Sequence, residues 1–164
     1  MFMAKSKSTG MIAAAMAITL QACAPVNQGS AESALAEGRL DDAAYDVQAA
    51  LAHDPDSLTL KNLAAQIFTQ RGANEYQGGQ MIAASEDFHR AINYYPTYAA
   101  AYDYLGMIAF QQNDWEAAIK YGSLGVGYEG KPEPGYVESA RQNLRKVQAG
   151  GLAPSRRTGN QASN

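Results

Sequence analysis

Hydrophobic residues recur at helical spacing along the chain, and the stretch from Leu40 to His53 shows the pattern in its simplest form. Asp41 and Asp42 would lie in the first turn of this helix, where the helix dipole favours negative charge. Pro55 cannot continue a helix and disfavours helical geometry in Asp54, so the helix should end there. The predicted buried stripe has spacings of three and four: Leu40, Ala43, Ala44, Val47, Ala50 and Leu51.

A second pair of helices is predicted after this proline. Ser57 is a suitable N-cap for a helix that continues past Gly72 to Tyr76 or Gln77. A glycine inside a helix costs about 1 kcal/mol relative to alanine, so a kink or break at Gly72 is the alternative. After a turn at Gly78-Gly79, the return helix is predicted from Met81 to Tyr94. The inward side chains of the pair are Leu60, Leu63, Ala64, Ile67 and Phe68, followed by Ala84, Phe88, Ala91 and Ile92.

A third pair follows, with a helix over Tyr98 to Gln112, a turn at Asn113-Asp114 and a second helix that begins at Trp115. Three glycines near the end of that second helix should weaken it, although they also suit a thin helix packed closely on its neighbour: Gly122, Gly125 and Gly127. A last helix is predicted from about Gly135 to Gln148, with polar and basic residues toward solvent. It would cover the open end of the array.

The helix pairs form an internal repeat. Gly38, Leu40, Ala43, Ala50 and Pro55 return 41 residues later as Gly79, Met81, Ala84, Ala91 and Pro96, and most of these positions return again after 34 residues. A repeating unit of 34 residues indicates a helix pair, and the seven additional residues indicate one helix that is longer by about two turns. The first helix of the first unit would begin at Ser30 or Ser33 and end near Gly38. We therefore expect an all-α fold, a short α-solenoid of about three hairpins with a C-terminal capping helix.

The N-terminus resembles a bacterial lipoprotein signal. Lys5 and Lys7 precede a hydrophobic stretch, Met11 to Leu20, that is too short to span a bilayer. The sequence Leu20-Gln21-Ala22-Cys23 resembles the lipoprotein box, which implies that Cys23 is the lipidated first residue of the mature chain. The alternatives are a chance cysteine after an ordinary signal, or a buried thiol of the fold. Ala24, in place of the aspartate that retains such proteins at the inner membrane, favours the outer membrane.

These features divide the chain into a signal peptide (1–22), a short tether (23–30), a helical repeat domain (31–149) and a disordered tail (150–164). Removal of the two signal-peptide lysines changes the formal net charge of −3 to −5. A mildly acidic domain argues against nucleic acid as a partner and against a polybasic hold on lipid, so membrane attachment would depend on Cys23.

The second and third repeat units resemble the tetratricopeptide repeat (TPR) family. The third unit has Tyr102 at the aromatic position, Leu105-Gly106 at the Leu-Gly pair, and Trp115, Ala118 and Gly125 in the second helix. The second unit has Phe68, Gly72, Met81, Ala84, Phe88, Ala91 and Pro96 at the equivalent positions. The first unit departs from the pattern, with Ala31 and Ala34 in place of a glycine and an aromatic residue, so it resembles a degenerate cap. Gly122 also departs from it, since an aromatic residue is usual there.

The resemblance implies a concave groove lined by the first helix of each unit. Carried over by position, the groove residues are Gln66, Thr69, Ala73, Tyr76 and Gln77 in the second unit, and Ala100, Asp103, Met107, Phe110 and Gln111 in the third. Tyr76, Met107 and Phe110 would be its apolar anchors. The lysines and asparagines with which some family members clamp a C-terminal carboxylate are missing at these positions, which favours an apolar or helical peptide segment bound in a helix-in-groove or extended mode.

Candidate chemistry is sparse elsewhere. His53 and His89 lack the nearby histidine or cysteine that a metal site needs and are interpreted as surface residues. Glu86 and Asp87 are adjacent on a helix and point in different directions, which argues against an acid–base pair. We therefore expect neither an enzyme nor a cofactor or metal site. Five tyrosines crowd one junction: Tyr102 is assigned to the core and Tyr95 and Tyr98 to packing of the turn, while others, with Tyr94 and Tyr104 in the same group, could contact a partner.

The functional expectation is an outer-membrane lipoprotein that faces the periplasm and binds a protein or peptide segment of an envelope machine. It resembles the TPR lipoproteins that help type IV and tight-adherence (Tad) pili or their secretins to assemble. An adaptor for peptidoglycan-modifying enzymes is the alternative, and an enzyme or small-molecule carrier is the third. The small number of units also leaves room for self-association.

Overall fold

The computed structural model describes residues 27–150, and all its regular elements are α-helices. In chain order they are α1 (Gln28–Ala36), α2 (Leu40–His53), α3 (Leu58–Gln77), α4 (Met81–Tyr94), α5 (Ala99–Gln111), α6 (Trp115–Glu129) and α7 (Gly135–Ala149). The signal peptide, Cys23 and the first tether residues lie outside the described residues, as does the tail after Gly150.

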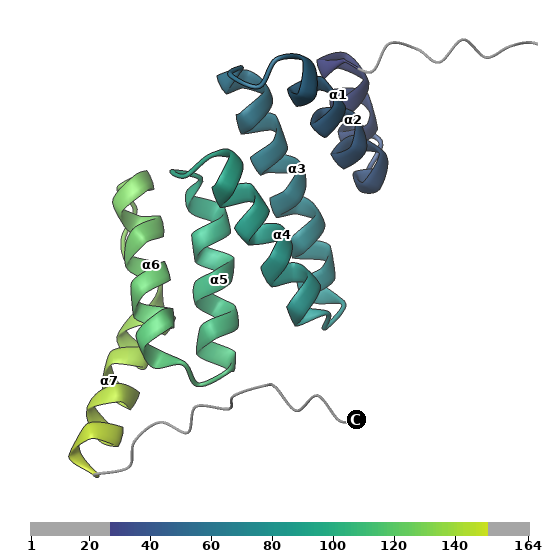
Figure 1. Ribbon diagram of the computed structural model, residues 1–164. Coiled ribbons are helices and arrows are strands. Elements are labelled where there is room, and N and C mark those ends of the chain that lie inside the picture. The colour runs from purple at the N-terminus through teal and green to yellow at the C-terminus, as the bar shows by residue number, and fades with distance from the viewer. Residues whose placement is uncertain (1–26, 151–164) are drawn as a thin grey trace, which may run out of the picture.

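The helices form three hairpins that lie side by side. Figure 1 shows α1 with α2, α3 with α4 and α5 with α6 arranged in a row, and α7 follows α6 at the far end. Contacts join each helix to the next along the chain, with the most extensive ones inside the α3–α4 and α5–α6 hairpins. The structure thus confirms the expected all-α solenoid with a final helix on its last hairpin.

Local signals set most helix ends. The Ser57 hydroxyl accepts a hydrogen bond from the Leu60 amide at the start of α3, as predicted. Gly38 and Gly79 both have positive φ, at 74° and 77°, and turn the chain between the two helices of a hairpin. Asn113 occupies the corresponding position of the third hairpin with φ 61°, which asparagine tolerates better than most residues.

The first helix begins earlier than predicted. It starts at Gln28, not at Ser30 or Ser33, because Asn27 is its N-cap and Ser30 completes a reciprocal capping box. The Ser30 amide donates to Oδ1 of Asn27 at 3.1 Å, and the Asn27 amide donates to the Ser30 hydroxyl at 3.2 Å. The first turn of α1 therefore lies inside the segment 23–30 that the sequence assigned to the tether.

The long helix of the repeat is α3. It has 20 residues against 13 in α5, which accounts for the seven additional residues between the first and second repeats. It runs unbroken through Gly72, where a Cβ atom would lie 2.9 Å from the Phe88 ring and 3.1 Å from the Ala84 carbonyl oxygen. Because glycine has no side chain, α4 can approach α3 closely at this point. The predicted alternative of a break at Gly72 is thus not observed.

The glycines of the last hairpin lie within a continuous helix that packs closely on its neighbours, which is one of the two interpretations given for them above. The three glycines do not shorten α6, which continues to Glu129 and ends at Gly130 in the left-handed conformation. A Cβ atom on Gly122 would overlap Cγ2 of Val137, and one on Gly125 would overlap Oδ1 of Asp103. Gly127 has nothing within 4 Å of such an atom. Two of the three glycines therefore allow close packing on α5 and α7.

The core consists mainly of alanines and of leucine, isoleucine and valine side chains, with a few aromatic rings among them. All six residues of the predicted α2 stripe are buried, as are Phe68 and Phe88 at the centre. Tyr94 stacks on Phe68 with ring centroids 5.6 Å apart. The Tyr102 hydroxyl donates to the Pro96 carbonyl at 2.9 Å, which confirms its place in the core. The rings of Tyr95 and Tyr98 meet edge to face in the turn between α4 and α5, also as predicted.

Candidate functional site

The first helices of the hairpins form the inner wall of the solenoid. The backbone of α1 approaches that of α3, α3 approaches α5 and α5 approaches α7. The backbones of α2, α4 and α6 do not approach one another as closely, and α4 meets α6 through the edge-to-face contact of His89 with Tyr121. In a curved row of hairpins, helices on the concave side lie closer together than those on the convex side. We therefore call the exposed surface of α3 and α5 the inner face, and all the predicted groove residues belong to these two helices.

A polar and aromatic bridge joins α3 to α5 across the inner face. The Tyr76 ring meets the Tyr104 ring edge to face, with centroids 5.9 Å apart. Nε2 of Gln111 donates a hydrogen bond to the Tyr76 hydroxyl. Beneath them, Tyr104 stacks on Phe88 of α4 at 4.7 Å. Two predicted groove residues, Tyr76 and Gln111, are thus brought together, and Tyr104 is a third member that the positional assignment missed.

The predicted residues of the second unit differ in their accessibility. Gln66 and Gln77 are exposed, and Ala73 and Tyr76 are partly exposed. Thr69 is buried, with 6% of its surface exposed, and its hydroxyl has no hydrogen-bond partner among the described residues. Thr69 therefore has little surface that a partner could contact, whereas Gln66 and Gln77 are exposed.

In the third unit, two predicted residues face α6 and α7. The Phe110 ring packs against Trp115 at 5.3 Å and Tyr136 at 6.1 Å, measured between ring centroids. Asp103 lies against Gly125, and its backbone carbonyl accepts a hydrogen bond of 3.4 Å from the Tyr136 hydroxyl. These contacts arise because α7 covers that side of α5. Met107 and Ala100 remain partly exposed.

Burial also affects the ionisation of Asp103 and Tyr136, which meet where α5 packs against α7. Loss of solvent raises the pKa of Asp103 above its ordinary value, the Glu129 carboxylate adds to the rise, and Lys131 opposes it. Oδ1 of Asp103 is buried and has no hydrogen-bond partner within residues 27–150. Burial, together with the Asp103 charge, raises the pKa of Tyr136 to about 12. Asp103 is therefore an acidic group that the fold accommodates poorly when it is ionised.

An ionic cluster centred on Arg71 was not predicted. Nε and Nη2 of Arg71 donate to the two carboxylate oxygens of Asp87 at 2.5 and 2.9 Å, and Nη1 donates to Asp41 at 2.9 Å. Arg90 donates to Asp87 at 3.1 Å. Arg71 also lies over the Phe68 ring, 5.2 Å from its centroid. One guanidinium thus joins α2, α3 and α4.

The cluster is structural in character. Asp87 is 2% exposed, whereas its neighbour Glu86 is exposed, so the two acids point apart as predicted. The hydrogen bonds to Asp87 raise the pKa of Arg71, which keeps it charged. Burial and the nearby Asp87 charge raise the pKa of Glu75. The sequence held no local signal for this cluster, because Arg71 lies 30 residues from Asp41 and 16 residues from Asp87.

Other site chemistry is limited in the part of the chain that the structure describes. Residues 27–150 contain no group of three or more histidine, cysteine or acidic side chains placed to hold a metal ion. None of their helices has the length and apolar character needed to cross a bilayer. An open depression at the start of α4 is lined by Gly79, Gln80, Met81, Ile82, Ala83 and Glu86. The proposed lipid site, Cys23, lies outside these residues.

Comparison with known proteins gives a weak structural likeness. No family model and no curated protein sequence matches the chain. Among solved structures, the chain is similar to the crystal structure of the Sgt2 TPR domain from Aspergillus fumigatus. The TM-score is 0.43 and the identity 20%, over 82% of this chain and 87% of that one. A likeness of this size carries no argument by itself, and the fold assignment rests on the helices and their contacts.

Proposed function

We infer that this chain is a non-enzymatic scaffold that binds a protein segment on its inner face, held to the outer membrane through a lipid on Cys23. Its proposed task is to help a pilus or secretion apparatus assemble in the periplasm. Support for the anchor comes from the resemblance of Leu20 to Cys23 to the lipoprotein box. The pilus assignment rests on the resemblance of the whole arrangement, signal plus repeats, to pilus-assembly lipoproteins.

The observation that carries the binding proposal is the inner face itself. Its helices are held in place chiefly by packing within the α3–α4 and α5–α6 hairpins, so the face is formed before a partner arrives. Gln66, Gln77 and Gln111 project from it, and Tyr76 lies partly exposed between them and the core. A preformed surface lowers the entropic cost of binding. Aromatic residues at its centre supply contact area with few rotatable bonds.

The anchor and the binding face can be tested separately in cells. Metabolic labelling with a clickable fatty acid should mark the wild-type protein in the membrane fraction and leave Cys23→Ser unlabelled and soluble. The repeats should still fold in Cys23→Ser, since the cysteine precedes the first described helix. A Cys23→Ser protein that is still acylated and membrane-bound would show that the anchor assignment is wrong.

The partner can be identified by photo-crosslinking from a defined surface position. A photoreactive amino acid at Gln77 on the inner face should capture a pilus or secretin component, whereas the same residue at Glu116 on α6 should not. Capture of a cell-wall hydrolase at Gln77 would favour the peptidoglycan adaptor instead. Products from Glu116 alone would place the binding surface on the outer helices and contradict the proposal.

A further inference from the structure

The helix ends form two opposite edges of the solenoid. Helices α1, α3 and α5 begin at the edge where α2, α4 and α6 end, because the two helices of each hairpin are antiparallel (Figure 1). Asn27, the N-cap of α1, also lies at this edge. We call this edge, which comprises residue 27 and the segments 53–58, 94–98 and 128–131, the tether edge, since Cys23 precedes Asn27 by only four residues. The turns 37–39, 78–80 and 112–114 form the opposite edge.

The two edges differ in the side chains that they expose. The turns of the opposite edge consist of charged, carboxamide and glycine residues: Glu37-Gly38-Arg39, Gly78-Gly79-Gln80 and Gln112-Asn113-Asp114. At the tether edge, Leu58 is 72% exposed at the start of α3 and Tyr128 is 43% exposed near the end of α6. Ile82, in the first turn of α4, is an aliphatic side chain with similar exposure near the opposite edge. What distinguishes the tether edge is therefore its tyrosines.

These tyrosines extend along the tether edge from α4 to α6. The Tyr128 ring lies 5.4 Å from that of Tyr102, and the partly exposed rings of Tyr95 and Tyr98 meet at 6.5 Å, measured between centroids. Burial raises the pKa of Tyr98 and the Glu129 carboxylate adds to the rise, so the end of α6 lies beside the α4–α5 turn. Tyrosine has an apolar ring and a polar hydroxyl, and it is enriched where a membrane meets water.

The short tether determines which edge lies next to the membrane. The four residue steps from Cys23 to Asn27 span at most about 14 Å, so the start of α1 stays within that distance of the proposed lipid. Helix α3 has 20 residues and is about 30 Å long. The opposite edge can thus approach the lipid surface only if the solenoid lies on its side. The anchor therefore holds the exposed side chains of the tether edge at a high local concentration beside the membrane.

The faces of the solenoid are less suited to a lipid surface than this edge is. The outer helices expose more acids than bases, namely Asp41, Asp42, Glu86, Glu116 and Glu129 against Arg90 and Lys120. An acidic face is repelled by anionic headgroups. The inner face exposes mainly carboxamides, such as Gln66 and Gln70, which would lose their hydrogen bonds to water against lipid.

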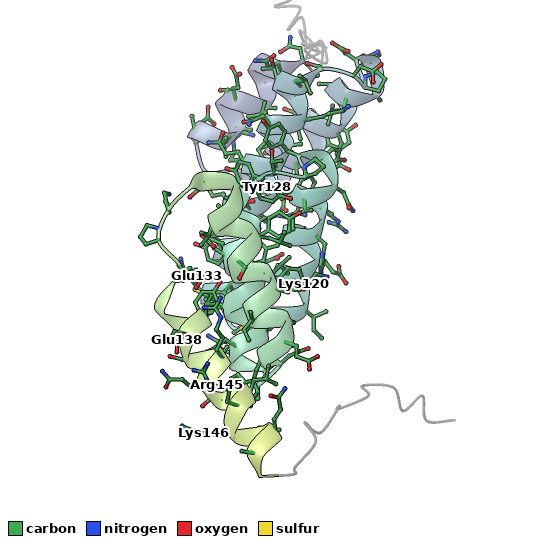
Figure 2. The ribbon with its side chains drawn as sticks, turned by 90° about the vertical axis from the view of Figure 1, so that its left-hand side faces the viewer. Lys120, Tyr128, Glu133, Glu138, Arg145 and Lys146 are labelled. Atoms are coloured by element: carbon green, nitrogen blue, oxygen red, sulfur yellow. The ribbon has the colours of Figure 1, made fainter. Side chains whose placement is uncertain are left out.

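Charge does not attract the tether edge to the membrane either. Two of its acids have basic neighbours, since Lys131 lies 2.5 Å from Glu129 and Lys61 lies 4.0 Å from Asp56. Figure 2 shows Tyr128 at the upper end of α6, and Arg145 and Lys146 near the lower end of α7. The basic side chains of α7 are thus far from the tether edge. Contact of this edge with lipid would depend on apolar and aromatic side chains.

We propose that the tether edge faces the phospholipid membrane, and that Leu58, Tyr128 and the tyrosines of the α4–α5 turn enter its headgroup layer beside the lipid on Cys23. The helices then point away from the membrane, and the inner face is open to the periplasm along its whole length. This inference rests on the proposed anchor and adds the orientation of the anchored chain. Because the contacts are apolar, the orientation should persist at about 1 M salt, where charges are screened within about 3 Å.

Fluorescence quenching from the membrane surface measures this orientation. The lipidated protein is reconstituted in vesicles of phosphatidylethanolamine and phosphatidylglycerol that contain a lipid with a spin-labelled headgroup. Cys23 is the only cysteine of the chain and carries the lipid, so one introduced cysteine takes the fluorophore. A fluorophore on Thr97→Cys at the tether edge should be quenched several-fold more than one on Gln112→Cys at the opposite edge. Labels on Gln66→Cys of the inner face and Lys120→Cys of α6 report a solenoid that lies on its side, and stronger quenching of either than of Thr97→Cys would overturn the proposal.

Two matched variants identify the side chains that hold the edge at the membrane. Leu58→Gln and Ile82→Gln each replace a highly exposed aliphatic residue in the first turn of a helix, at opposite edges. Leu58→Gln should shift the ratio of edge-down to other orientations by on the order of tenfold, the effect of returning one aliphatic side chain to water. Ile82→Gln should leave the quenching of the Thr97→Cys label unchanged. Equal effects of the two variants, or loss of quenching at about 1 M salt, would overturn the proposal.

Flotation of the same vesicles separates this inference from the proposed function. A protein that is not acylated and does not float with the vesicles would contradict the proposed anchor, and the orientation with it. A protein that floats but is quenched equally at Thr97→Cys and Gln112→Cys would overturn the membrane-facing edge alone. The anchor and the binding of a partner on the inner face would then stand.

Discussion

Arg71 and Asp87 in the α3–α4 hairpin occupy the same repeat positions as Leu105 and Tyr121 in the α5–α6 hairpin, 34 residues later in both cases. In α3–α4 the two positions form a partly buried ion pair with two hydrogen bonds. In α5–α6 they carry a buried leucine and a partly buried tyrosine. The same repeat positions thus hold an ion pair in the α3–α4 hairpin and apolar side chains in the α5–α6 hairpin.

The neighbours of the two hairpins explain this difference. Arg71 also reaches Asp41 of α2, so the charged version joins the second hairpin to the first. One residue further along the outer helices, Phe88 is fully buried and stacks on Tyr104, whereas Gly122 leaves space that Val137 and Tyr136 of α7 enter. A repeat position therefore fixes the direction of a side chain, while the next element in the row determines which side chain fits there.

The largest expected effect comes from removing the carboxylate of the ion pair. Asp87→Ala should lower the free energy of unfolding by about 3 kcal/mol, because it leaves the Arg71 guanidinium, only 20% exposed, without its main partner. The loss can be measured by urea unfolding followed with circular dichroism. A change below about 1 kcal/mol would show that water replaces the carboxylate and that the pair contributes little.

The double variant Arg71→Leu/Asp87→Tyr sharpens the comparison, since it gives α3–α4 the residues of α5–α6. Replacing a buried ion pair by apolar side chains is often neutral or stabilising. Asp41 and Arg90 are well exposed and can be hydrated when they lose their partners. We expect the double variant to recover most of the stability that Asp87→Ala loses. A double variant as unstable as the single one would mean that the two hairpins are not interchangeable here.

The next largest effect concerns Gly122, whose lack of a side chain allows α7 to pack closely on α6. Gly122→Ala should lower stability by about 1–2 kcal/mol, because the added methyl group overlaps the buried Val137 and this overpacking exceeds the gain in helix propensity. Gly127→Ala in the same helix meets no atom and should raise stability by up to about 1 kcal/mol. Trypsin should also cleave Gly122→Ala faster at Arg141 and Arg145 if α7 loosens. If Gly122→Ala and Gly127→Ala change the stability in the same direction, the packing argument is wrong.

Most of the fold was accessible from sequence because its signals are local. The bounds of α2 and α4 follow from hydrophobic spacing, from glycines in the turns and from Pro55 and Pro96 after the helix ends. The seven-residue difference between repeats likewise predicted the long α3. The start of α1 was missed although its signal is also local, since Asn27 and Ser30 form a capping box.

The site was less accessible because it depends on which helices meet. Gln66, Gln77 and Gln111 could be placed on the inner face from repeat positions alone. The orientation of Phe110 toward Trp115 and Tyr136 could not, since it depends on where α7 docks. The Arg71 cluster joins residues from three helices, and no periodicity in one helix reports on such a contact. Positional assignment places the predicted residues on α3 and α5, and packing decides which of these residues stay exposed.

The smallest expected effect concerns a repeat position at which both hairpins have a buried polar oxygen. Thr69 and Asp103 occupy equivalent repeat positions, and each has a buried oxygen that finds no hydrogen-bond partner in the described part of the chain. Only Asp103 ionises, and burial raises its pKa, with Glu129 adding to the rise and Lys131 opposing it. The folded chain therefore holds this proton more tightly than the unfolded chain does. The stability that Asp103 contributes is present below its ordinary pKa and is lost as the pH rises through the raised value.

Asp103→Asn removes this titration and keeps the shape of the side chain. Relative to wild type, the variant should gain stability near pH 7, by up to about 1 kcal/mol, and gain little near pH 3, where the wild-type carboxyl is already protonated. Urea unfolding of both proteins at the two pH values measures the difference, and acid effects on other groups cancel because both proteins share them. Equal differences at the two pH values would mean that the Asp103 carboxylate is as well solvated in the fold as in the unfolded chain. In that case the buried oxygen would have a water partner, and the third hairpin would tolerate a charge at the position where the second carries an uncharged threonine.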